Sequence, residues 1–173
     1  MHLIDFVEED IVNYKKTSMF LATCTCSFKC GIENCQNREL ANLKNIGVKD
    51  EDIIERYLAN DMTEAIVIGG LEPFDQFEEL INFCKTLNRY HVEDDLVIYT
   101  GYEREEIDSQ VEQLVALNAD RDLIIKFGRY DPTKATEKFN HTLGVKLASY
   151  NQYTVLFYKH YNNDFQKGEQ KYE

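Results

Sequence analysis

Four of the five cysteines in this chain fall within twelve residues, in the segment Cys24–Cys35 (CTCSFKCGIENC). In a reducing compartment, clustered cysteines indicate a metal site rather than disulfides, and soft thiolates bind zinc or iron–sulfur clusters. Three neighbouring cysteines on one loop, Cys26, Cys30 and Cys35, are enough to hold a cluster and leave one iron open to a small molecule. The spacing therefore favours an iron–sulfur site.

Cys24 leaves other interpretations open. A four-thiolate zinc site would use it with the other three, although structural zinc sites usually draw two close pairs of ligands from separate knuckles. Cys24 also suits a small apolar position at the end of a strand. Four cysteines so close together make buried, unreactive thiols the weaker alternative. The fifth, Cys84, falls on the apolar face of a predicted helix and is expected in the core.

A second segment with chemical potential is 68–74 (IGGLEPF), which follows an apolar strand. Gly69 and Gly70 allow a ligand to approach the backbone closely. Glu72 can accept a hydrogen bond from an ammonium group. Alone, the segment also fits a tight turn; beside the cysteines, we interpret it as part of a binding site.

Thr100 offers a hydroxyl in a third such segment, 99–102 (YTGY), which equally fits a turn from strand to helix.

The elements that must position these segments alternate along the chain. Apolar strands are predicted at 18–23, 65–68, 96–99, 123–127 and 154–158, and amphipathic helices at 50–58, 74–87 and 103–117. The first helix is expected to turn four apolar side chains inward: Ile53, Ile54, Tyr57 and Leu58.

This alternation predicts an α/β fold in which residues 1–173 form a single domain with a mostly parallel sheet. In such sheets a ligand binds beyond the carboxyl ends of the strands. The cysteines, Gly69-Gly70 and Thr100 all follow strands, so we expect them to meet at that edge.

The composition narrows the possible partners. The 173 residues carry a formal net charge of −12, which disfavours nucleic acid and leaves a small molecule or a basic protein surface. No apolar run reaches the length of a bilayer, and the N-terminal segment lacks the pattern of a secretory signal. We therefore expect a cytoplasmic protein without membrane contact, ending in a polar, mobile tail after about residue 160.

The cysteine loop resembles the cluster motif of the radical-SAM superfamily, in which three residues and then two separate three cysteines. CSFKC, from Cys26 to Cys30, has the first spacing, whereas four residues separate Cys30 from Cys35. Asn34 stands where that motif has an aromatic residue.

Further segments occur in the order seen in one branch of that superfamily, the activating enzymes of anaerobic ribonucleotide reductases. The segment 69–73 (GGLEP) is similar to their Gly-Gly-Glu motif for the amino group of S-adenosylmethionine, and YTGY to the segment after their third strand. The segment 122–132 (DLIIKFGRYDP) resembles their fourth-strand segment, with Lys126 where an acidic residue is often found. The segment 147–152 (LASYNQ) resembles one near their C-terminus.

This resemblance implies a partial (βα) barrel and a mechanism. A 4Fe–4S cluster on Cys26, Cys30 and Cys35 would bind S-adenosylmethionine at its open iron, with Gly69, Gly70, Glu72 and Thr100 also contacting it. One electron from a flavodoxin or ferredoxin would cleave the cofactor, and the resulting radical would abstract hydrogen from a glycine of the reductase's large subunit. No acid–base pair is needed, so none of the four histidines is expected to be catalytic: His2, His91, His141 and His160.

Two alternatives stay open at this point. One is a radical-SAM enzyme that acts on another peptide or on a small molecule. The lack of a large insertion after the sheet loops leaves little room for an elaborate substrate pocket, which favours a protein substrate. The other is a non-enzymatic, zinc-stabilised interaction module.

Overall fold

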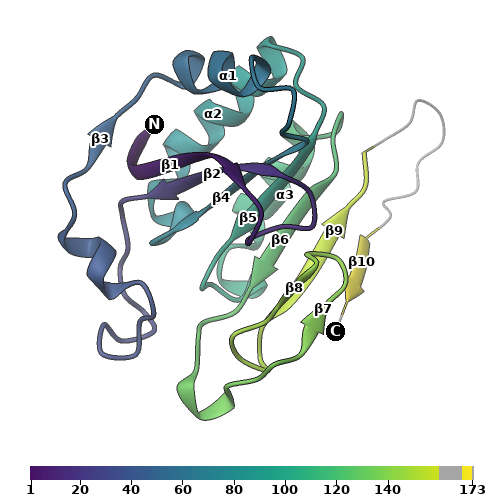
Figure 1. The fold of residues 1–173 in the computed structure, drawn as a ribbon. Coiled ribbons are helices and arrows are strands. Elements are labelled where there is room, and N and C mark those ends of the chain that lie inside the picture. Colours follow the sequence, from purple (N-terminus) through teal and green to yellow (C-terminus); the bar gives the residue numbers. More distant parts are fainter. Residues whose placement is uncertain (160–168, 173) are drawn as a thin grey trace.

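The computed structural model describes residues 1–159 and 169–172, which form one large sheet with helices packed against it (Figure 1). The strand order is β10-β9-β6-β5-β4-β2-β1-β3. The strands are β1 (His2–Asp10), β2 (Ser18–Thr23), β3 (Ile46–Gly47), β4 (Ala65–Gly70), β5 (Asp95–Tyr99), β6 (Leu123–Phe127), β9 (Tyr153–Phe157) and β10 (Glu169–Tyr172). Two short strands, β7 (Phe139–Asn140) and β8 (Val145–Lys146), form a separate hairpin.

The centre of the sheet is parallel. Strands β2, β4, β5 and β6 pair in parallel register, whereas the strands outside them pair antiparallel. The central strands are short apolar runs, buried on both faces, which is the pattern of parallel strands under covering layers. Thr23 pairs with Gly70, and Tyr99 with Lys126, so these four strands end along one edge.

Helices cover one face of this sheet. They are α1 (Asp50–Leu58), α2 (Phe77–Arg89) and α3 (Asp108–Leu117). Their buried side chains, Cys84 among them, form the larger core with one side of the strands. The opposite side is covered by Tyr14, Leu143 and Leu147, from the β1–β2 connection and the β7–β8 segment. The sheet has two ends, at β3 and β10, and is not closed.

The predicted α/β fold with a parallel central sheet is confirmed, and an open sheet is compatible with a partial barrel. The predicted strands and helices all occur, with α2 and α3 preceded by 3-10 turns at Pro73–Gln76 and Arg104–Glu106. Among the described residues, no helix is long and apolar enough to cross a membrane.

Three expectations were wrong or incomplete. Leu58, predicted to face inward, is 50% exposed at the last residue of α1, whereas Tyr57 beside it is buried. β1 was missed because its outer half is acidic and mostly exposed (VEED) and does not alternate like a buried strand. The tail after about residue 160 was expected to be polar and mobile. Its residues 169–172 form β10, which pairs with β9, and residues 160–168 lie outside the described part.

Candidate functional site

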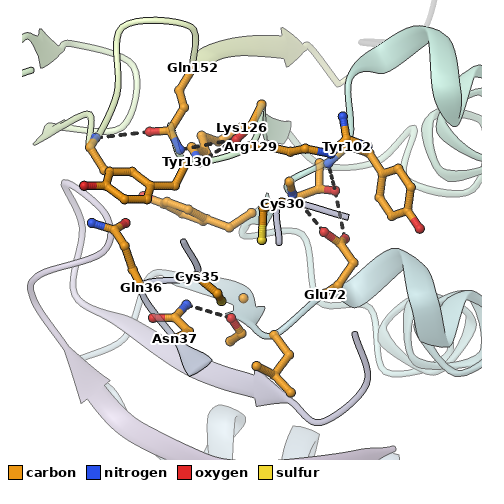
Figure 2. Close-up of a pocket in the computed structure, with 18 of the residues that line it drawn as sticks. Cys30, Cys35, Gln36, Asn37, Glu72, Tyr102, Lys126, Arg129, Tyr130 and Gln152 are labelled. Atoms are coloured by element: carbon orange, nitrogen blue, oxygen red, sulfur yellow. Dashed lines mark hydrogen bonds between the residues drawn. The ribbon is translucent and has the colours of Figure 1, made fainter. Parts of the chain in front are cut away.

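A cavity of about 270 Å³ opens at the edge where the parallel strands end. The cysteine loop, the turns after β4, β5 and β6, and the segment after β8 contribute to its wall (Figure 2). All of the residues predicted for the site line this one cavity: Cys26, Cys30, Cys35, Gly69, Gly70, Glu72 and Thr100. The strand ends therefore bring together predicted site residues that are up to 74 residues apart, Cys26 and Thr100.

The cysteine loop is tied to the turn after β4 by its backbone. The Glu72 amide donates to the Thr25 carbonyl at 2.9 Å, and the Cys24 amide donates to Oε1 of Gln76 at 3.2 Å. At the other end of the loop, the Asn37 side chain donates to the Gly70 carbonyl at 2.9 Å. These bonds fix both ends of the loop against the edge of the sheet.

Between these anchors the loop turns sharply. Phe28 has a φ of 51° and Gly31 a φ of 79°, both in the left-handed region. The Gly31 amide closes a turn onto the Phe28 carbonyl at 2.9 Å. Such turns reverse the chain between Cys26 and Cys30, so that both thiols reach the same cavity.

The three cavity thiols fit an iron–sulfur cluster. Burial raises the pKa of Cys26 to about 11, and burial together with the neighbouring Cys35 raises the pKa of Cys30. The protein alone therefore favours neutral thiols there, whereas a coordinated metal removes the proton from a thiol. In the described part of the chain, no three Cys, His, Asp or Glu side chains are grouped to hold one metal ion. A cluster is bound differently, because each thiolate bonds to its own iron.

Cys24 is oriented away from this set. Its thiol lies 3.7 Å from Oε1 of Gln76, and it is not among the residues that line the cavity. This position agrees with Cys24 as the end of a strand and disfavours a four-thiolate zinc site.

Glu72 is buried against the turn after β5. Its Oε1 accepts from the Thr100 hydroxyl at 2.8 Å and from the Phe74 amide at 3.2 Å, while Oε2 accepts from the Gly101 amide at 2.8 Å. Burial raises its pKa to about 7, against the lowering effect of these bonds. A carboxylate has about four acceptor positions, so one on Oε2 is left for a ligand.

Gly69 and Gly70 line the cavity, and the packing of the strands also explains why these two residues are glycine. A Cβ on Gly70 would lie 2.7 Å from the Thr23 amide nitrogen, and its φ is 95°. A Cβ on Gly69 would lie 3.2 Å from the Phe20 ring. The close packing of β4 against β2 thus requires glycine at position 70, and it leaves little room for a side chain at Gly69. Thr100 likewise has an internal role, since its hydroxyl also accepts from the Tyr102 amide at 3.0 Å.

The cavity carries more positive than negative charge, which composition did not reveal. Four basic side chains line it together with the single carboxylate of Glu72: Lys29, Lys126, Arg129 and Lys146. Sequence reasoning noted Lys126 only as a departure from a pattern. It missed Arg129 and Gln152, whose side chain donates to the Gly128 carbonyl at 3.2 Å. The described histidines His2, His91 and His141 do not line the cavity, and His160 lies outside the described residues.

The cavity thus combines three thiols with a buried carboxylate at the end of a parallel sheet. Residues 15–153 match the 4Fe-4S single cluster domain family, and the chain belongs to that family. It is also similar to the anaerobic ribonucleoside-triphosphate reductase-activating protein of Haemophilus influenzae (strain ATCC 51907 / DSM 11121 / KW20 / Rd), with 24% identity over 118 residues, which cover 64% of this chain and 74% of the relative. The resemblance to activating enzymes is therefore confirmed. No solved structure matches the chain.

Proposed function

We propose that this protein is a radical-SAM activating enzyme for an anaerobic ribonucleotide reductase. The observation that carries the proposal is the shared cavity, which three thiols line together with Glu72. When bound, a 4Fe–4S cluster would supply the electron that cleaves S-adenosylmethionine and so produce a glycyl radical on the large subunit of the reductase. Membership of the 4Fe-4S family and the relative's name support this assignment.

The residues of this chain have distinct proposed roles. Cys26, Cys30 and Cys35 hold the cluster, and the loop anchors keep them at the cavity. Glu72 accepts from the ammonium group of S-adenosylmethionine through the free position on Oε2. Gly69, Gly70 and Thr100 shape the adjoining wall, with Thr100 orienting the Glu72 carboxylate. Glu72 and Thr100 are buried, so this part of the wall is shielded from water.

The partners follow from the same proposal. The large reductase subunit is the protein substrate and would cover the open cavity. A flavodoxin or ferredoxin is the electron donor, and the cytoplasm is the compartment in which such partners meet. The neighbouring residues Lys29 and Arg129 place positive charge beside an anionic cluster, which favours its binding.

The test begins with anaerobic purification and reconstitution with iron and sulfide. We expect a brown protein that forms 5′-deoxyadenosine from S-adenosylmethionine after reduction. Cys30→Ala should lose both the colour and the product, whereas the matched variant Cys24→Ala should keep both, because Cys24 faces Gln76. A colourless protein that carries zinc, and loses it in Cys24→Ala, would instead establish the zinc-stabilised interaction module.

The substrate is tested separately. The reconstituted protein should form a complex with the large reductase subunit and generate its glycyl radical, observed by electron paramagnetic resonance. A protein that forms 5′-deoxyadenosine but neither binds the reductase nor generates the radical would be a radical-SAM enzyme for another peptide or a small molecule.

A further inference from the structure

Lys126 is a buried cation with few partners. It lies in β6, is 9% exposed, and lines the cavity (Figure 2). Its Nζ makes one long hydrogen bond, 3.5 Å to the Gly128 carbonyl, and lies 5.7 Å from the centre of the Tyr99 ring. An ammonium group has three donors, and a buried charge is costly unless it is paired. Lys126 therefore has ammonium donors that no described residue accepts.

The other basic residues of the cavity differ in this respect. Arg129 pairs with Glu106 at 2.6 Å, Lys29 lies 3.8 Å from the same carboxylate, and Lys146 pairs with Glu137 at 2.5 Å. Within the described part of the chain, Lys126 has no carboxylate at ion-pair distance. Lys126 is thus the buried basic side chain of the cavity that has no carboxylate partner among the described residues.

The carboxylate of Glu72 indicates what kind of anionic ligand would pair with Lys126. Glu72 lines the same cavity. Burial lowers the pKa of Lys126 to about 8, and the negative charge of Glu72 opposes part of that lowering. One buried carboxylate and one buried ammonium group complement a ligand that carries an ammonium and a carboxylate together. That combination is the α-amino-acid end of a molecule.

We infer that Lys126 binds the carboxylate of the amino-acid end of S-adenosylmethionine, opposite Glu72 and its contact with the ammonium group. This inference rests on the proposed function and names the residue that recognises one end of its cofactor. Lys126 stands where the resembling segment often has an acidic residue, so the local charge of the site is inverted here.

The test measures binding rather than turnover. S-adenosylmethionine and decarboxylated S-adenosylmethionine are titrated into the oxidised, cluster-loaded protein by anaerobic calorimetry, with wild type and Lys126→Met compared. Loss of a buried charge-assisted contact should weaken binding of S-adenosylmethionine roughly 10- to 100-fold in the variant. Binding of the decarboxylated ligand should change less than about threefold, because it lacks the group that Lys126 contacts.

The matched control is Lys146→Met, which removes a cavity lysine that already has a carboxylate partner and should leave the preference between the two ligands unchanged. Iron content and thermal unfolding of Lys126→Met should equal those of wild type. Equal losses for both ligands, or no loss for either, would overturn the role of Lys126 alone. A wild type that binds neither ligand would overturn the proposed function together with this inference.

Discussion

Glu72 links the stability of this site to pH. It is 5% exposed, and burial raises its pKa from 4.5 to about 7. The folded protein therefore binds the Glu72 proton more tightly than the unfolded chain does. The resulting stabilisation is complete below pH 4.5 and is lost as the pH rises to about 7.

This linkage predicts the behaviour of Glu72→Gln, which cannot titrate. As the pH rises from 4.5 to about 7, wild type should lose roughly 3 kcal/mol of unfolding free energy relative to the variant. Denaturant unfolding at several pH values measures the difference. Glu78→Gln, at an exposed position of α2, controls for replacing a carboxylate by an amide. A wild-type-to-variant difference that stays constant across this range would contradict the prediction.

The sequence predicted where the site residues lie better than it predicted which side chains they contact. The cysteines, the glycine pair, Glu72 and Thr100 follow apolar strands, and parallel strands end at one edge, so their meeting in one cavity could be predicted. The partners of each side chain could not. Among the described residues, Lys126 has no carboxylate partner while Lys146 has one. This difference depends on side-chain packing, which a lysine's position in a strand does not predict.

At the scale of elements, the cysteine loop is held by a latch formed by Ser27, Asp75 and Tyr102. The Ser27 amide donates to Oδ2 of Asp75, and the Tyr102 hydroxyl donates to Oδ1 of the same carboxylate, both at 2.5 Å. Nζ of Lys29 lies 4.5 Å from the centre of the Tyr102 ring. The latch joins the loop between Cys26 and Cys30 to the turns after both β4 and β5.

The latch predicts a loss of cluster retention in Tyr102→Phe. Removing one hydroxyl deletes the bond to Asp75 and loosens the loop by about 1 kcal/mol, so the cluster should release iron to a chelator roughly five times faster. The rate of colour loss under anaerobic conditions measures this. Tyr130→Phe, which removes a hydroxyl from another cavity tyrosine, should release iron at the wild-type rate. Equal rates in wild type and Tyr102→Phe would show that the latch does not hold the loop.

Elements with a strong apolar pattern were predicted closely, whereas edge strands were not. β6 (Leu123–Phe127) has the expected bounds because it is a continuous apolar run in the middle of the sheet. β10 (Glu169–Tyr172) consists of polar residues and tyrosine, and it is a strand because β9 offers an open edge. Pairing of this kind depends on tertiary context, which local propensity does not describe.

Across the whole molecule, charge is distributed unevenly. The chain carries −12, yet residues 126–148 contain five basic and two acidic residues, a local charge of +3. This segment runs from the cavity wall through the β7–β8 hairpin, where Lys134 and Lys138 are exposed and Phe139 is 48% exposed. Local positive charge beside the cavity, on an otherwise acidic protein, would favour the approach of an acidic partner.

This distribution predicts how reduction of the cluster depends on charge. With an acidic flavodoxin as donor, Lys138→Glu should slow bimolecular reduction by on the order of 3- to 10-fold at low salt, because it weakens electrostatic steering toward the cavity. Added salt should reduce the difference by screening. Lys85→Glu makes the same change in net charge on α2, away from the cavity, and should slow reduction much less. Stopped-flow absorption measures the rates. Equal slowing in both variants would mean that only net charge matters, and that residues 126–148 are not where the donor approaches.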